Sequence, residues 1–348
     1  MPNEIQVRAE RAIREKVFPG CVIGFVERGK QRAVLPFGAY TYDADAAPVL
    51  ENTIYDVASI TKSIPTASLA LHYIDSGQLA LTDKLIVYVP EFRNSDRELV
   101  TIKHLLTYTL GGYAFSALKN KTPHELFETI MTHDFTVHPG SGFLYSNVPA
   151  FLLGLVVEKI GGDTLENLAQ TIFFQPLGMA RTSLLPQYFS RDDIAPTEIE
   201  EWRGHVQGSV HDESAYVFTV KGGKAVGHAG LFSTAPDLLN FLDMLLHKGE
   251  MGGRQYLSPG IIAEMSTNQI PELGASTGLG WQLQQRWMGH SAGKHTFGKT
   301  GFTGTSVCVD VERGIGLVIL SNRTFPKRPQ NDDVIYQFRS DIADIVLR

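Results

Sequence analysis

Segments with the character of β-strands lie near both ends of this chain, and the segments between them have the periodicity of helices. The strand-like segments are residues 21–27, 31–37, 279–283, 306–311 and 315–320. Short apolar runs bounded by turn residues are typical of strands. Because strands bury their apolar faces by joining a common layer, we expect an α+β fold in which one antiparallel sheet is built from both chain ends.

Helices are expected at both termini and throughout the middle of the chain. One-faced apolar periodicity predicts terminal helices over residues 4–17 and 334–347, which we expect to pack on the sheet. The central helical segments are residues 63–75, 101–107, 123–132, 146–160, 163–174, 236–247 and 259–267. We expect residues 1–62 and 275–348 to form a sheet lobe and residues 63–274 a mainly helical lobe, with the active site between the two.

The composition argues against several classes of protein. Apolar residues make up 43% of the 348 residues and charged residues 20%, which is ordinary for a globular protein. The net charge of −6 indicates no nucleic-acid partner, and no apolar run approaches the roughly 20 residues of a membrane span. Residues 1–16 are highly charged and lack the apolar middle of a secretory signal, so we expect a cytoplasmic protein unless a leader was removed. Cys21 and Cys308 lie in strand-like runs and are expected to be reduced core residues.

A serine and a lysine are spaced for chemistry at the start of the first central helix. Ser59 precedes Lys62 by three residues, so on a helix the Lys62 amine can lie beside the Ser59 hydroxyl. A neutral amine could take the proton of this hydroxyl and make it a nucleophile. Ser59 could equally be a helix N-cap, and the second Ser-x-x-Lys, at residues 116–119, is interpreted as a surface pair.

Two further motifs carry residues that suit the same chemistry. In Tyr145-Ser146-Asn147, the tyrosine can relay a proton and the Asn147 amide can hold a substrate carbonyl, although Asn147 is also a plausible N-cap. Lys299-Thr300-Gly301 precedes the C-terminal hairpin. A second cation near Lys62 would push Lys62 toward its neutral form, and Gly301 would let a substrate backbone approach the strand edge.

These three motifs, in this order, resemble those of the serine β-lactamase and penicillin-binding-protein superfamily. The Tyr-x-Asn form is similar to the branch that contains class C β-lactamases, DD-peptidases and related esterases. The segments 56–62, 227–234 and 298–304 also resemble this branch, and the likeness runs from about Phe18 to Asn322.

The resemblance implies a role for each reactive residue. Ser59 would be the nucleophile that accepts the acyl group, and Lys62 its base or proton relay. Tyr145 would shuttle protons to the leaving group, and Lys299 would tune Tyr145 or bind a substrate carboxylate. Whether Lys62 or Tyr145 is the base stays open.

The resemblance also implies substrate-binding residues. Asn147 would orient the substrate amide, and Thr300, Gly301 and Phe302 would border the substrate, with the backbone N–H groups of Ser59 and Phe302 as the oxyanion hole. His228, in a glycine-flanked loop, could face the site, although it is more often a structural residue. We expect the loops 108–116 and 184–213 to form walls of the pocket.

The expected function is hydrolysis of a small ester, amide or short D-peptide through an acyl-enzyme on Ser59, without metal or organic cofactor. Phe302 stands where many β-lactamases have a small hydroxyl residue, which together with the missing export signal favours an esterase, amidase or D-amino-acid-type peptidase. The scissile bond and the oligomeric state stay open.

Two other functions remain as alternatives. One is a family member that binds a peptide or acyl ligand without turnover. The remote one is a P-loop nucleotide hydrolase, because residues 293–300 match G-x-x-x-x-G-K-[ST]. That motif needs a helix directly after it, whereas Gly301-Phe302-Thr303-Gly304 and a strand-like run follow here.

Overall fold

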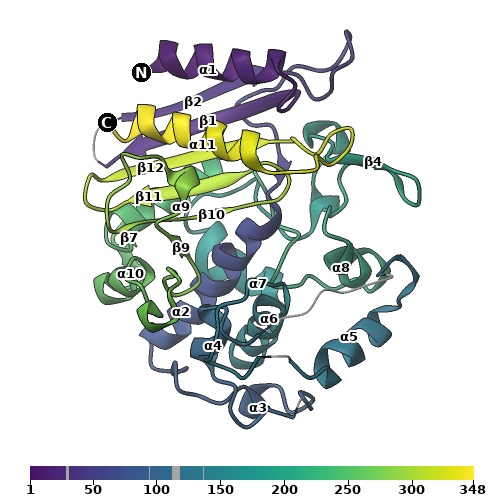
Figure 1. Cartoon of the computed structure of the whole chain (residues 1–348), viewed down its shortest axis with the longest axis vertical. Helices are drawn as coiled ribbons and strands as arrows, with labels where there is room; N and C mark the ends of the chain where they lie inside the picture. The colour runs from purple at the N-terminus through teal and green to yellow at the C-terminus, as the bar shows by residue number, and fades with distance from the viewer. Residues whose placement is uncertain (29–30, 94, 112–117, 136) are drawn as a thin grey trace.

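A six-stranded antiparallel sheet is the largest single element of the protein (Figure 1). The computed structural model describes residues 1–28, 31–93, 95–111, 118–135 and 137–348. The strand order is β2–β1–β12–β11–β10–β9. These strands are β1 (Gly20–Glu27), β2 (Gln31–Gly38), β9 (Gln282–Leu283), β10 (Thr296–Thr300), β11 (Ser306–Asp310) and β12 (Ile315–Ser321). The expected α+β fold, with one sheet made from both chain ends, is confirmed.

The two ends of the chain join where β1 pairs with β12. The register runs from Cys21 opposite Ser321 to Glu27 opposite Ile315. Along β1, Cys21, Ile23 and Phe25 face one layer of the core, and Val22 and Val26 face the other. Because both faces of this strand are buried, β1 has a nearly continuous apolar sequence.

Helices cover both faces of the sheet. On one face lie α1 (Pro2–Arg14) and α11 (Asp333–Val346), whose apolar sides share a core cluster with Phe18 and Phe25. Helix α9 (Ala235–Leu246) packs on the opposite face, against β12 and β1. Since α9 belongs to residues 63–274, part of the segment expected in the helical lobe packs on the sheet. The lobe boundaries stay a proposal.

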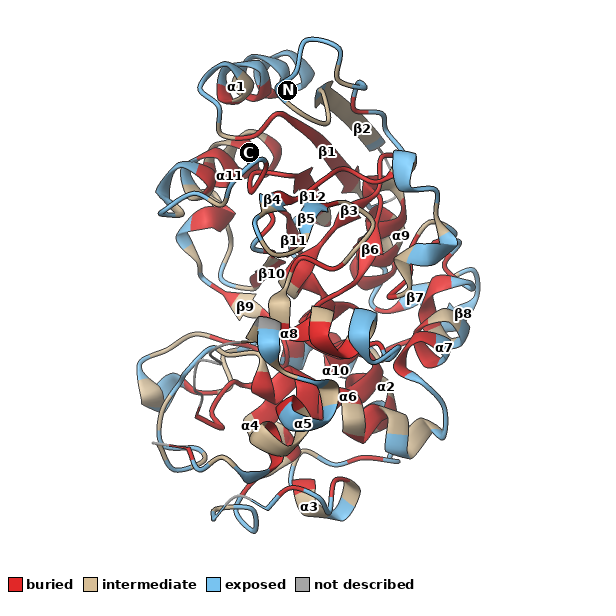
Figure 2. Ribbon diagram, turned by 90° about the vertical axis from the view of Figure 1, so that its right-hand side faces the viewer, coloured by how far each residue is buried: buried red, intermediate tan, exposed pale blue. Residues whose placement is uncertain are grey.

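The remaining helices gather beyond the β9–β10 edge of the sheet (Figure 2). They are α2 (Ser68–Asp75), α3 (Leu85–Tyr88), α4 (Ile102–Leu106), α5 (Pro123–Thr132), α6 (Val148–Gly161), α7 (Leu165–Ala169), α8 (Glu213–Tyr216) and α10 (Pro259–Met265). Helix α6 is apolar on almost every side, and α2, α3, α4 and α7 pack around it. An all-round apolar sequence is expected of a helix at the centre of a core.

Short strand pairs complete the structure. They are β3 (Tyr55–Asp56) with β6 (Phe232–Ser233), β4 (Glu198–Glu200) with β5 (Gly204–Val206), and β7 (Glu250–Met251) with β8 (Arg254–Gln255). The β3–β6 pair joins the segment before Ser59 to the segment before α9. No helix of the described residues is long and apolar enough to cross a membrane.

The continuous helix expected over residues 63–75 is wrong. A turn of 3₁₀ helix spans Ala58–Lys62, the backbone leaves helical geometry at Ile64 (φ −120°, ψ 111°), and α2 starts only at Ser68. Ile64 precedes Pro65, and the residue before a proline is disfavoured in the α region. Ser59 therefore does not lie at the N-terminus of a long helix.

The P-loop alternative is also wrong. Thr296–Thr300, which contains the Gly-Lys-Thr of that pattern, is strand β10, and a turn then leads to strand β11. A phosphate loop requires the opposite arrangement, with a helix whose N-terminus follows the lysine directly.

Candidate active site

The 3₁₀ turn brings the Ser59 hydroxyl and the Lys62 amine together. A 3₁₀ helix has three residues per turn, so positions i and i+3 are aligned. The Nζ atom of Lys62 lies 2.9 Å from the Ser59 Oγ atom and donates to the carbonyl oxygen of His228 at 2.7 Å. The Lys62 side chain is buried, and burial lowers its pKa from 10.5 to about 8. A substantial fraction of this amine is therefore neutral in mildly alkaline solution.

A buried carboxylate holds the turn in place. Ala58 has a positive φ of 48°, which is unfavourable for a residue with a side chain. The Oδ1 atom of Asp56 accepts a hydrogen bond from the Ala58 N–H at 2.8 Å, and its Oδ2 atom accepts one from the His211 N–H at 2.7 Å. Burial raises the pKa of Asp56 to about 6. Asp56 thus connects the turn that carries Ser59 to the distant segment that begins at His211.

Two tyrosines enclose the amine of Lys299 on β10. The Lys299 Nζ atom donates to the Tyr108 hydroxyl at 3.0 Å and lies 4.5 Å from the ring centroids of both Tyr108 and Tyr145. Burial, helped by the charge of Lys62, holds the pKa of Lys299 well below its ordinary value. The Lys62 Nζ atom lies 5.5 Å from the Tyr145 ring centroid. Burial raises the pKa of the Tyr145 phenol, and its interaction with Ser59 opposes that shift.

Asn147, at the start of α6, is bonded to a group of polar side chains behind the cleft. Its Nδ2 atom donates to Asp212 Oδ2 at 3.0 Å and to Ser214 Oγ at 3.3 Å. Ser214 Oγ lies 2.8 Å from the Nε2 atom of His228. The His228 side chain is buried, so this histidine contributes its backbone carbonyl to Lys62 and its ring to the group around Asp212.

The turn after β10 docks onto the residues before Ser59. Thr303 Oγ1 donates to the Asp56 carbonyl at 2.7 Å, and Thr305 Oγ1 donates to the Val57 carbonyl at 3.1 Å. A Cβ atom on Gly301 would lie 2.3 Å from the Val57 carbonyl oxygen. Gly301 is therefore needed for this close backbone contact, which places Phe302 at the cleft beside Ser59.

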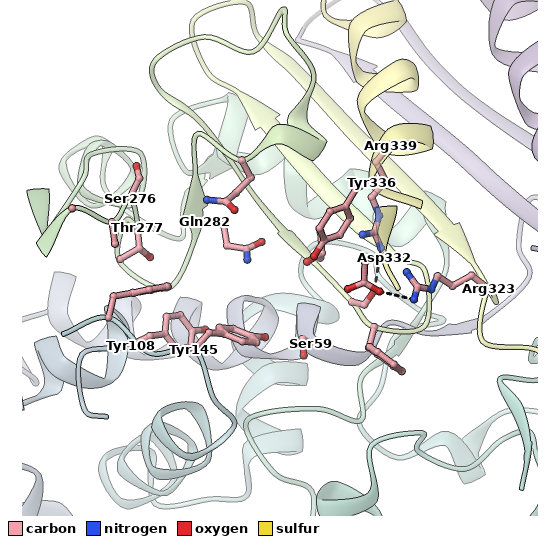
Figure 3. Close-up of a pocket in the computed structure, with 17 residues that line it drawn as sticks. Ser59, Tyr108, Tyr145, Ser276, Thr277, Gln282, Arg323, Asp332, Tyr336 and Arg339 are labelled. Carbon is pink, nitrogen blue, oxygen red and sulfur yellow. Dashed lines mark hydrogen bonds and ion pairs between the residues drawn. The ribbon is translucent and has the colours of Figure 1, made fainter. Parts of the chain in front are cut away.

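Ser59 opens into a cleft of about 580 Å³ (Figure 3). Its lining comes from the turn that carries Ser59, the segments at 108 and 143–145, residues 274–285, the turn at 300–302, and the α11 region. At one end Arg323 donates to Asp332 at 2.6 Å. Arg339, also at that end, donates to the carbonyl oxygens of Gly301 at 3.1 Å and Thr305 at 2.8 Å.

Comparison with known proteins identifies the family of this chain. The sequence model of the beta-lactamase family matches residues 7–339. This chain belongs to the beta-lactamase family. An Escherichia coli (strain K12) protein named "Putative D-alanyl-D-alanine carboxypeptidase" is 29% identical over 317 residues, 80% of this chain and 71% of that protein.

Two solved structures have the same fold. "EstCE1, a hydrolase with promiscuous acyltransferase activity" has a TM-score of 0.78 at 21% identity and covers 100% of this chain and 98% of its own. An octameric penicillin-binding protein homologue from Pyrococcus abyssi has a TM-score of 0.74 at 22% identity, and the match covers 99% of this chain and 77% of the homologue. This beta-lactamase family member is a serine hydrolase.

The structure gathers the residues singled out from the sequence into two groups. Ser59, Tyr145, Thr300, Gly301 and Phe302 line the cleft. Lys62, Lys299, Asn147 and His228 are bonded behind it. The roles that the resemblance implies for these residues remain proposals. Residue 116 of the second Ser-x-x-Lys lies outside the described residues.

The predicted pocket walls are only partly correct. Tyr108 lines the cleft, and residues 112–117 lie outside the described part of the chain. The described lining contains no residue from 184–213; residues 274–285 and 323–339 supply the walls instead. Segment 184–213 contacts the cleft lining from behind: the His211 ring stacks on the ring of Phe302, with the two centroids 5.8 Å apart.

Several functional candidates escaped the sequence analysis. They are Asp56, Asp212, Ser214, Arg323, Tyr336 and Arg339. One signal was available: Arg339 interrupts the buried face of α11 between Phe338 and Ile342, where a charge requires a specific partner. In the described part of the chain, no group of three or more His, Cys, Asp or Glu side chains is arranged to hold a metal ion.

Proposed function

We propose that this serine hydrolase cleaves small carboxylic esters through an acyl-enzyme on Ser59. The observation that supports this proposal best is the 2.9 Å contact between Ser59 Oγ and a buried Lys62 amine whose pKa is lowered to about 8. A buried amine whose pKa lies near neutral pH is suited to act as a general base toward a serine.

The reaction has two steps, acylation of Ser59 and hydrolysis of the acyl-enzyme. Ser59 Oγ attacks the ester carbonyl while the neutral Lys62 amine takes the hydroxyl proton, and the carbonyl oxygen becomes an oxyanion beside the Ser59 and Phe302 N–H groups. The C–O bond to the leaving group then breaks, and the alcohol leaves with the proton that Lys62 took, relayed through Tyr145, so that the amine is neutral again. In the second step water attacks the acyl carbon, the bond from this carbon to Ser59 Oγ breaks, one water proton passes to Ser59 Oγ and the acid is released.

The basic side chains around the cleft favour a neutral ester over a substrate that carries a carboxylate. Lys299 is enclosed by Tyr108 and Tyr145, Arg323 is paired with Asp332, and Arg339 is bonded to two backbone carbonyls. Each of these basic side chains is buried. A carboxylate would therefore have to displace protein partners to reach them.

A second candidate is a D-alanyl-D-alanine carboxypeptidase. The resemblance in sequence to the Escherichia coli protein of that printed name favours it. An amide leaving group needs full protonation before it departs, and Tyr145 beside Ser59 is placed to provide this proton.

The test compares wild type with Ser59→Ala on three substrates. We expect a burst of p-nitrophenol from p-nitrophenyl acetate in wild type, an acetyl mass on the Ser59 peptide, and neither in Ser59→Ala. Release of D-alanine from a peptide ending in D-Ala-D-Ala, with little ester cleavage, would favour the second candidate. A lasting penicillin adduct would indicate a penicillin-binding site, and penicillin consumed without an adduct a β-lactamase. No Ser59-dependent reaction with any of the three would contradict the proposal and favour a binding protein without turnover.

A further inference from the structure

The carboxylate of Asp212 is the centre of a polar group that supports the site from behind. It accepts hydrogen bonds from Asn147 Nδ2 at 3.0 Å, from Ser214 Oγ at 2.5 Å and from the Ala215 N–H at 2.9 Å. A carboxylate that accepts several hydrogen bonds is held in its ionised form. In agreement, the pKa of Asp212 lies well below its ordinary value, where contacts with His228, Lys62 and Ser214 outweigh burial.

The direction of each hydrogen bond in this group follows from the charge. An ionised carboxylate only accepts, so the Ser214 hydroxyl gives its proton to Asp212 and can only accept from His228. The Nε2 atom of His228 therefore carries a proton, and burial lowers the pKa of this histidine. For the same reason Asn147 must turn its Nδ2 atom toward Asp212, which determines the orientation of its amide.

Asp212 also acts on Lys62 across His228. The Lys62 amine donates to the His228 carbonyl, and the ring of the same histidine joins the group around Asp212. The other titratable groups near this amine are Lys299 and Tyr145, with His228. Burial lowers the pKa of Lys62, and the negative charge of Asp212 raises it. Among the described residues, Asp212 is thus the carboxylate whose negative charge raises the pKa of Lys62, against the effect of burial.

We propose that Asp212 is a positioning residue of the hydrolysis, which orients Asn147 and whose negative charge acts on the Lys62 amine beside His228. This proposal rests on the proposed function of Ser59 and Lys62. It accounts for two residues outside the lining of the cleft: Asn147, whose amide is oriented by Asp212, and His228, whose ring joins the group around Asp212 and whose carbonyl accepts from Lys62.

The decisive variant is Asp212→Asn, which removes the charge and keeps a residue that caps helices well, as Asp212 caps α8. We expect the midpoint of the rise of kcat/KM with pH to fall by about one unit, because the amine loses a nearby negative charge. We also expect KM to rise, since the new amide offers Asn147 one acceptor atom fewer. A merely structural role would lower kcat at every pH and leave the midpoint unchanged.

Two matched variants complete the test. Asp212→Glu keeps the charge, and Ser214→Ala keeps the carboxylate while it removes the hydroxyl between Asp212 and His228. We expect both to have a midpoint close to that of wild type, whatever their rates. A shift in Asp212→Asn alone supports the proposal, and the same midpoint in all four proteins overturns it.

A measurement that needs no turnover covers the case of an inactive variant. NMR titration of Lys62 in protein labelled with ¹³C at the lysine ε carbon reports its pKa directly, with Lys62→Arg to assign the signal. A lower Lys62 pKa in Asp212→Asn supports the proposal, and an unchanged one overturns it. If wild type and Ser59→Ala cleave p-nitrophenyl acetate equally, the proposed function fails, whereas the Lys62 titration still decides the role of Asp212.

Discussion

Among the described residues, no carboxylate is bonded to the buried amine of Lys62, and burial lowers its pKa to about 8. We expect kcat/KM for p-nitrophenyl acetate to rise about tenfold per pH unit below this value and to level above it, because only the neutral amine can take the Ser59 proton. Initial rates of hydrolysis at a series of pH values from about 5.5 to 9.5 measure this profile. A flat profile would exclude Lys62 as the titrating base.

Tyr145 shares the space between Lys62 and Lys299, and the sequence left open which residue is the base. We expect Tyr145→Phe to lower kcat by about 10²–10⁴ because a positioned proton relay contributes that much. The pH midpoint near 8 should remain if Lys62 is the base. Loss of the midpoint in Tyr145→Phe would instead assign the base to Tyr145.

At the scale of elements, the turn from Gly301 to Thr305 positions Phe302 by docking on Val57. We expect Gly301→Ala to lower the free energy of unfolding by about 1–3 kcal/mol, since the new methyl group would overlap the Val57 carbonyl. Ester hydrolysis should also slow, because Phe302 would move away from Ser59. Urea unfolding and ester kinetics measure the two effects.

Gly260 in α10 provides a control for this substitution. A Cβ atom there meets only Ser258 Oγ, at 3.7 Å. Because alanine is favoured over glycine within a helix, Gly260→Ala should leave the protein as stable or stabilise it by up to about 1 kcal/mol. Equal losses in the two variants would show that the Val57 contact is not the cause.

At the scale of the whole molecule, Asp56 joins the turn that carries Ser59, the segment at His211 and, through its carbonyl, the turn at Thr303. Its folded-state pKa is raised from 3.8 to about 6 by burial. The folded protein therefore binds this proton more tightly than the unfolded chain, and the associated stability is present at low pH and lost as pH rises toward 6. The shift of about two units corresponds to ~3 kcal/mol.

The Asp56→Asn variant tests this linkage, because it removes the titration and keeps a similar shape. We expect wild type to lose about 3 kcal/mol relative to the variant as pH rises from below 3 to above 7, about 2 kcal/mol of it between pH 4 and 6, with a constant difference above pH 7. Urea unfolding at intervals of half a pH unit provides the values. Parallel curves for the two proteins across this range would show that Asp56 is not the titrating group.

The α+β fold and the motif residues could be predicted from the sequence, because strand character, helical periodicity and motif spacing are local patterns. Strand character and helical periodicity predicted most elements to within a few residues, and the spacing of Ser59 and Lys62 placed hydroxyl and amine on one face of a turn. Strand β10 was not predicted as a strand, and the break at Ile64 was missed although Pro65 signals it.

The residues that surround these motifs could not be predicted, because they come together only when the chain packs. Asp212 meets Asn147 across 65 residues, and Tyr108 meets Lys299 across 191, with no local pattern to pair them. Burial decided the rest, because the pKa of Lys62 depends on solvent exclusion by residues from several distant segments. A motif names the reactive groups, whereas the packed interior sets their charge and orientation.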